Sequence, residues 1–254
     1  MLQSILTETA ATVSLIDCII CIVTAIILGG VFGHLFGRLL SERYQDTLNK
    51  VCGVSVLFIG IAGALEGMLT VSDNSVVSGK AMLIVLSLVL GAIIGELLNI
   101  EDKFERFGEW LKKKTGNSKE KQFVDGFVTA SLTVSIGAMA IVGAIEDGLF
   151  GDFSILMTKA VLDFIIIIVM TGSMGKGCAF SAIPVGILQG SVTVLAKFIK
   201  PIMTEVALSN LSLIGSILIF CVGLNLVWGK KIRVANLLPA VVLAVIAAFL
   251  PINL

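Results

Sequence analysis

Histidine is nearly absent from this sequence, and charged residues are scarce. The chain has one histidine, His34, and 14% of its residues are charged, about half of the usual share in a soluble domain. A single histidine supports neither a Ser-His-Asp triad nor a zinc site. The sequence contains no nucleotide loop of Walker spacing and no haem or flavin motif. It therefore predicts no enzyme, no cofactor and no metal centre.

The five cysteines and the charge balance exclude two further classes. Cys18 and Cys21 have CxxC spacing, but they lie in an apolar run without a second pair of ligands. Together with the other three cysteines they are interpreted as packing residues. The formal net charge is zero, which argues against nucleic acid as a partner.

Long apolar runs are what the sequence has in abundance. Hydrophobic residues make up 57% of the chain, and its mean hydropathy is +1.05. A helix needs about 20 apolar residues to cross a bilayer. Eight segments meet this need, at about 14–37, 51–70, 81–99, 124–145, 153–172, 182–199, 207–228 and 234–253. The sequence predicts an all-α, polytopic membrane protein with one transmembrane domain, 1–254. The sixth segment is the least hydrophobic and either spans or re-enters.

Basic residues divide unevenly between the two ends of these segments. With the N-terminus outside, one side receives all 18 basic residues except Lys80, Lys159, Lys197 and Lys200. By the positive-inside rule that side is cytoplasmic. Both termini are therefore predicted to be extracytoplasmic.

The longest polar stretch, Ile100 to Lys121, has helical periodicity. Its apolar residues share one face, opposite the charges: Ile100, Phe104, Phe107 and Leu111. This pattern predicts an amphipathic helix on the inner membrane surface, with the Lys112–Lys114 run near anionic headgroups. The lipid bilayer is thus one predicted partner, and homo-oligomerisation stays open.

Two short passages of the sequence recur. Leu28–Leu35 matches Leu90–Leu97, and Gly63–Gly67 matches the stretch that begins at Gly143. Internal repeats of helix pairs occur in transporters. The sequence predicts repeat-like units at about 14–70 and 80–150, with degenerate later units at about 153–200 and 207–253.

Asp163 lies about ten residues into the apolar run 153–172, near the centre of a bilayer about 30 Å thick. Ionisable residues at that depth usually face a protein interior and have a function. Lys159, four positions earlier, shares its helix face. Two interpretations stay open, a self-neutralising pair and an ion or substrate site.

Further carboxylates recur near the predicted outer face. Glu66 and Glu146 end the second and fourth spans, after helices rich in glycine and alanine that can pack closely. Two carboxylates at short range raise one pKa, which suits proton exchange. Asp147 follows Glu146 and adds to an acidic outer mouth. A solvated helix end is the alternative for each.

The fifth and sixth spans are joined by residues that do not favour a continuous helix. Between Thr171 and Pro184 the sequence holds three glycines and then the proline. The stretch is either a broken-helix binding element of the kind that transporters use or a plain cytoplasmic turn. Ser181 within it, with Gln189 and Asn225 at depth in the sixth and seventh spans, are candidates to line a substrate path.

Several of these strings together resemble a known family. They are Gly137–Asp152, Lys159–Asp163, Ser181–Pro184 with Gln189-Gly190, Gly223–Asn225 and Ile232–Pro239. The chain resembles the bacterial YqgA/YdfK-like membrane proteins over nearly its whole length. It differs at the start, where Ile22 replaces an expected asparagine. The resemblance implies an inner-membrane protein of unknown function, sometimes described as a transporter.

We therefore expect a secondary transporter or permease for a small solute, coupled to H⁺ or Na⁺. Asp163 would be the central site with Lys159, while Glu66, Glu146 and Asp147 would gate or exchange protons. The alternatives are a passive channel, or a membrane scaffold whose polar residues only hold helices together.

Overall fold

The computed structural model describes residues 20–37, 41–72, 75–135, 140–141, 143–144, 147, 153–201 and 203–250. They belong to two compact units, each built from separated stretches of the chain. Unit 1 takes its residues from Met1–Asp46, Asn117–Ser135 and Met139–Ile202, and unit 2 from Thr47–Gly116, Ile136–Ala138 and Met203–Leu254. The predicted repeat units, by contrast, are continuous stretches of the sequence. The two compact units do not test them, so the repeats stay a prediction.

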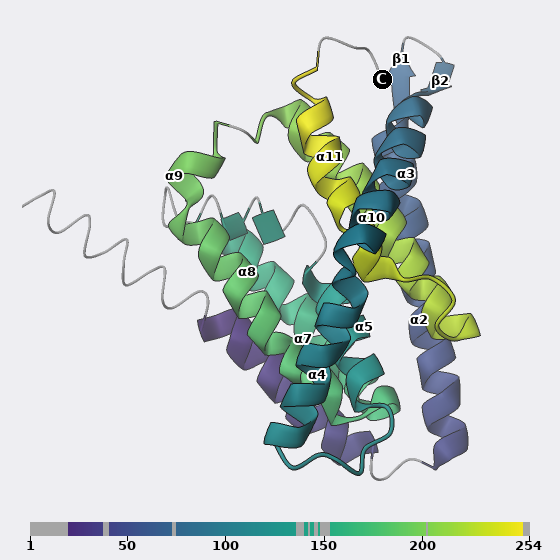
Figure 1. Ribbon diagram of the computed structural model, residues 1–254, viewed down its shortest axis with the longest axis vertical. Coiled ribbons are helices and arrows are strands. Elements are labelled where there is room, and N and C mark those ends of the chain that lie inside the picture. Colours follow the sequence, from purple (N-terminus) through teal and green to yellow (C-terminus); the bar gives the residue numbers. More distant parts are fainter. Residues whose placement is uncertain are drawn as a thin grey trace, which may run out of the picture. The chain divides into compact units, whose positions relative to one another are not determined.

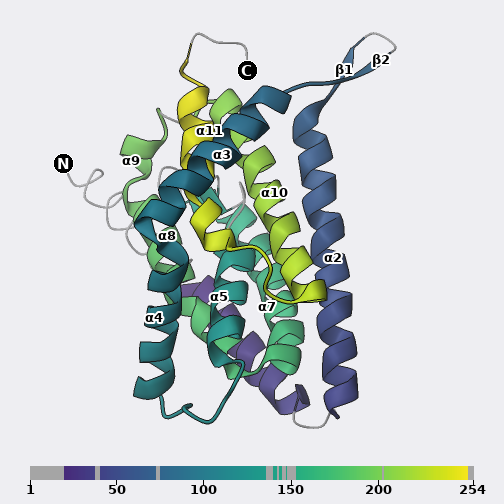
Figure 2. The same ribbon diagram turned by 45° about the vertical axis from the view of Figure 1, so that its right-hand side comes forward.

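The regular elements in the described part of unit 1 are all helices. Its longer elements are a first helix, Ile20–Gly37, then α5 (Phe123–Ser135), α7 (Ser154–Met174) and α8 (Ala182–Val194). The short helix η1 (Lys176–Ser181) joins α7 to α8, and α9 (Ala196–Ile199) follows. Helices α5, α7 and α8 lie side by side in both views (Figures 1 and 2), and η1 packs against α5.

Unit 2 contains most of α2 (Glu42–Met68), then α3 (Ala81–Leu98), α4 (Ile100–Lys114), α10 (Glu205–Trp228), η2 (Val234–Leu237) and α11 (Pro239–Ala247). Helix α11 packs on both α3 and α10 (Figure 2). Local signals explain several of these boundaries. The Thr204 hydroxyl accepts a hydrogen bond from the Ala207 amide at 3.2 Å and caps α10. Pro239 occupies the first turn of α11, where it removes no helical bond.

Six helices in the described residues are long and apolar enough to cross a membrane. They are Ile20–Gly37, Asp46–Met68, Ala81–Leu98, Ser154–Met174, Lys176–Val194 and Glu205–Trp228. Each coincides with a predicted span. The predicted segment 234–253 corresponds to the shorter apolar helix Val234–Ala247. The predicted segment 124–145 is helical over Phe123–Ser135, and part of its remainder lies outside the described residues. The helical membrane class is thus confirmed, and the count of eight spans stays a prediction.

Glycine sets the distance between helices in both units. In unit 1, a methyl group added to Gly33 would lie 2.4 Å from the Ile168 carbonyl oxygen on α7. In unit 2, a methyl group on Gly95 would lie 1.7 Å from the Asn236 carbonyl oxygen. Gly33 and Gly95 are equivalent in the predicted repeat. Small residues let backbones approach in this way, and van der Waals packing then holds membrane helices together.

One element departs from the all-α prediction. Strands β1 (Leu69–Ser72) and β2 (Ser75–Ser78) form an antiparallel hairpin between α2 and α3, with Leu69 opposite Ser78. Its threonine and valines are β-branched, and such residues favour strands over helices. The hairpin was missed because four-residue strands are too short to produce a periodic signal beside the long apolar runs.

Candidate functional site

Lys159 and Asp163 form an ion pair inside unit 1. They lie one helical turn apart on α7, with Asp163 near the middle of its 21 residues, and Lys159 Nζ donates to Asp163 Oδ2. The two side chains are 8% and 6% exposed. The predicted pairing is therefore confirmed, and the pair is removed from solvent within an apolar span.

The ammonium group of Lys159 has a second acceptor that the sequence did not indicate. Its Nζ lies 2.7 Å from the carbonyl oxygen of Val134 on α5. Lys159 therefore joins α7 to α5 and donates to two acceptors, the Asp163 carboxylate and a backbone carbonyl.

The predicted break after the fifth span is present. Helix α7 ends at Met174, and Gly175 has a φ of 89°, a conformation that glycine adopts without a steric penalty. The short helix η1 follows and is packed within the unit. A methyl group on Gly177 would lie 1.9 Å from the Phe123 carbonyl oxygen. The segment is thus interrupted helix held against protein, not an exposed turn.

Three polar side chains on the helices α7, η1 and α8 are buried and have no hydrogen-bond partner among the described residues. They are Thr171 on α7, Ser181 at the end of η1 and Gln189 on α8, at 2%, 0% and 1% exposure. Both polar atoms of the Gln189 amide are unpartnered. Buried polar groups are nearly always bonded to protein or water, so these three side chains are candidates to bond with water or a ligand. Thr171 was missed, although it lies eight residues after Asp163 on the same face.

Two other predicted site residues belong to unit 2, and their surroundings are different. Asn225 on α10 is engaged by the loop that follows: its Oδ1 accepts from the amides of Lys231 at 2.9 Å and Ile232 at 3.0 Å. Its Nδ2 donates to the Ile232 carbonyl at 2.7 Å. Asn225 thus shapes the end of α10. Glu66 is exposed in the last turn of α2.

The remaining predicted carboxylates are described only in part. Asp147 belongs to unit 1 and is buried, at 1% exposure. Glu146 lies outside the described residues. The predicted approach of Glu66 to Glu146 therefore stays a prediction.

Unit 2 has a charged cluster of its own, which sequence reasoning missed. Glu101, on the first turn of α4, is 3% exposed and accepts a hydrogen bond from the Ala235 amide at 2.8 Å. Lys230 lies 3.0 Å from Glu101 and also pairs with Glu105. Partial burial lowers the pKa of Lys230, but hydrogen bonds and charge from Glu105 and Glu101 outweigh it and raise the pKa above its usual value.

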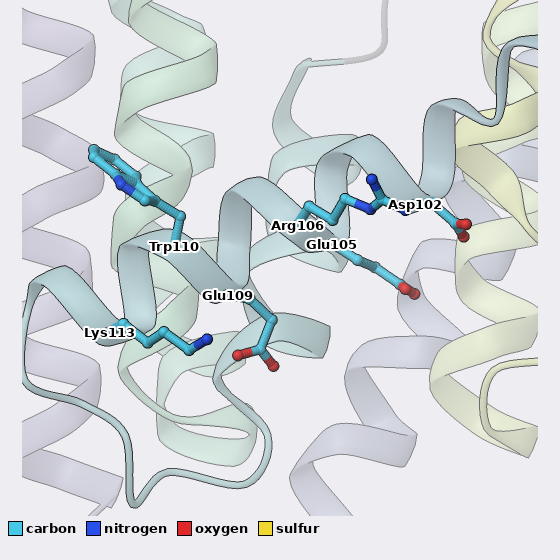
Figure 3. A pocket seen from close by; sticks show the side chains of 6 residues that line it. All are labelled: Asp102, Glu105, Arg106, Glu109, Trp110 and Lys113. Atoms are coloured by element: carbon cyan, nitrogen blue, oxygen red, sulfur yellow. The ribbon is translucent and has the colours of Figure 1, made fainter.

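Helix α4 has the predicted amphipathic pattern, and its place on the membrane surface stays a prediction. Glu101, which the sequence groups with the charged face, is buried, as are Gly108 and Leu111. The solvent-facing side carries a shallow hollow lined by Asp102, Glu105, Arg106, Glu109, Trp110 and Lys113, all from this one helix (Figure 3). It mixes both signs of charge and contains none of the predicted site residues.

The apolar helices and the buried ion pair define a helical, multi-pass membrane protein. A family model described as "Protein of unknown function (DUF554)" matches residues 18–249, and the chain belongs to that family. The chain is similar to the uncharacterized membrane protein YdfK of Bacillus subtilis (strain 168), at 28% identity over 88% of this chain and 92% of YdfK. It is also similar to the uncharacterized protein YqgA of Escherichia coli (strain K12), at 30% identity over 87% and 91%. The resemblance read from the sequence is confirmed. No solved structure matches.

Proposed function

We propose that this protein is a secondary transporter that moves a small solute across the bacterial inner membrane, coupled to H⁺ or Na⁺. One observation carries the proposal: a buried Lys159–Asp163 pair lies in the same unit as three unpartnered polar side chains on an interrupted helix. Charged groups inside a membrane cost several kcal/mol and are usually retained for function. Interrupted helices are the binding elements of many transporters.

In this proposal the residues of unit 1 divide into two roles. Asp163, held by Lys159, is the coupling-ion site, and Asp147 exchanges protons with it. Ser181, Gln189 and the newly found Thr171 line the solute path, because they offer both donors and acceptors that protein atoms do not occupy. Eight spans in repeated pairs, with both termini outside, complete the proposed topology, and Glu66 and Glu146 act at the outer face.

A membrane scaffold is the second candidate, and a specific observation favours it. Several buried polar groups of unit 2 bond across helices or fix loops, as Asn210 Nδ2 does to the Ala244 carbonyl at 3.2 Å and Asn225 does to its loop. Buried amides in membrane proteins often have only this role. A scaffold predicts that every buried polar side chain acts on stability alone.

Gln189 and Asn210 allow a direct test, because both are buried amides and only Asn210 has a protein partner. Purified protein would be screened by thermal shift against ions and metabolites, with the variants Gln189→Leu and Asn210→Leu. We expect Gln189→Leu to keep the basal melting temperature and lose the shift caused by a ligand. Asn210→Leu should lose stability by about 1–3 kcal/mol, because the Ala244 carbonyl loses its donor, and keep the shift.

The same screen separates the alternatives. A Gln189→Leu variant that melts as early as Asn210→Leu, with no ligand shift in the parent, would favour the scaffold. A passive channel would show flux that does not saturate.

A further inference from the structure

The second acceptor of Lys159 bears on the identity of the coupling ion. We propose that this ion is a proton, not Na⁺, and that it adds to the carboxylate of Asp163 while Lys159 stays charged and bound to Val134. The inference rests on the proposed function and deepens it.

The position beside the Asp163 carboxylate is already taken by a cation. Lys159 Nζ donates to Oδ2 of Asp163, and both side chains are almost fully buried. A sodium ion bound to the same carboxylate would lie close to the ammonium group, and two like charges repel strongly where little water screens them. Moving Lys159 away would leave a buried ammonium without its counter-charge. Binding of Na⁺ is therefore opposed by the observed geometry.

A proton avoids the first cost, because it places no second cation beside the ammonium group. It comes from the aqueous phase, forms an O–H bond on a carboxylate oxygen and converts Asp163 from an anion into a neutral acid. Protonation removes the counter-charge of Lys159, but its ammonium group keeps the 2.7 Å hydrogen bond to the Val134 carbonyl on α5. The pair is neutral before protonation and carries one positive charge after it. The second acceptor is what makes the protonated state tolerable in a buried position.

Other titratable groups lie on the elements packed against α7. The first helix carries Cys21 and the half-buried His34, α5 carries the exposed Asp125, and η1 carries Cys178 and Lys176, which pairs with Glu120 at 3.4 Å. The segment that contains Asp147 approaches α7 as well, because a methyl group on Gly143 would lie 2.9 Å from Leu156. Asp147 is the second buried carboxylate in the described part of unit 1 and the strongest competitor for the proton.

Infrared difference spectroscopy can follow the proton on the purified full-length protein in lipid nanodiscs. Spectra would be recorded from about pH 6 to 9, above the range in which exposed carboxylates take up protons and where a buried carboxyl can titrate, in NaCl and in choline chloride at equal ionic strength. The variants are Asp163→Asn, Asp147→Asn and the control Asp125→Asn. If Asp163→Asn does not fold, Asp163→Glu is used in its place, because this variant keeps the charge and shifts the carboxylic C=O band.

We expect a carboxylic acid C=O band on acidification that persists in Asp147→Asn and Asp125→Asn, disappears in Asp163→Asn, and has the same midpoint in both salts. Loss of the band in Asp147→Asn alone would overturn the assignment to Asp163 and leave the transport proposal intact. A midpoint that falls by about one pH unit for each tenfold rise in Na⁺, as one-for-one exchange requires, would establish Na⁺ as the ion instead. A spectrum with neither a band nor a cation effect would overturn both proposals.

Discussion

The Nζ atom of Lys159 lies 2.7 Å from the carbonyl oxygen of Val134, and this contact joins α7 to α5. Any lysine and aspartate four residues apart on a helix would lie on the same face and could pair. The bond to Val134 exists only because two helices, separated in the sequence, meet at this level. Because of this bond the pair contacts a second helix, whereas Lys159 and Asp163 alone would form a local pair within α7.

The charge pair can be tested by a double-mutant cycle. Lys159→Met or Asp163→Leu alone leaves an uncompensated buried charge, which costs about 3–5 kcal/mol. The double variant should recover most of that stability, measured as the free energy of unfolding in detergent. If Asp163 takes part in transport, the double variant should fold and remain inactive in a proteoliposome assay. An active double variant would contradict a transport role for Asp163.

The contact between Glu101 and Ala235 should contribute to the stability of unit 2. Glu101→Leu leaves the buried Ala235 N–H without an acceptor, and we expect a loss of about 1–3 kcal/mol of unfolding free energy. Glu101→Gln retains a carbonyl acceptor and should lose less. Glu109→Gln, an exposed change on the same helix, should stay within about 0.5 kcal/mol of the parent. Equal losses in all three variants would show that the contact is not specific.

The raised pKa of Lys230 predicts a pH dependence at the alkaline end. A lysine whose folded pKa exceeds its unfolded value of about 10.4 stabilises the protein fully below that value, and this contribution is lost as pH rises through the folded pKa. The parent should therefore melt later than Lys230→Met near neutral pH, and the two should converge above the folded pKa. A difference in melting temperature that grows with pH would contradict the assignment.

Close glycine contacts predict sensitivity to a single methyl group. Gly95→Ala would place its Cβ 1.7 Å from a backbone oxygen, so the helices must separate, at a cost of about 1–3 kcal/mol or more. Gly79→Ala is the matched control, since nothing lies within 4 Å of its added methyl group. Thermal denaturation of the two purified variants checks this, and equal melting temperatures would refute so close an approach of the Asn236 carbonyl to Gly95.

Topology can be tested by cysteine labelling in a cysteine-free background. The charge bias predicts that Ser118→Cys reacts with an impermeant maleimide only after the membrane is opened. Ser78→Cys, exposed on β2, should react in intact cells. The opposite labelling pattern would reverse the orientation, and with it the outer placement of Glu66.

Periodicity and composition alone determined much of this protein. Apolar runs of about 20 residues must become helices in lipid, because no other segment satisfies its own backbone there, and six such helices coincide with predicted spans. The spacing of Lys159 and Asp163 placed both on one face for the same geometric reason. The cluster of glycines that ends with Gly177, followed by Pro184, predicted the end of α7.

Tertiary structure decided which of the polar residues have partners. Asn225 and Gln189 look alike in the sequence, as single amides in apolar runs, yet Asn225 is engaged by its loop and Gln189 is unpartnered. Glu101 looked like a solvated charge until its helix was placed against the Ala235 amide. Backbone donors and acceptors occur at nearly every residue and carry no signature in the sequence, so only packing decides which side chain meets one.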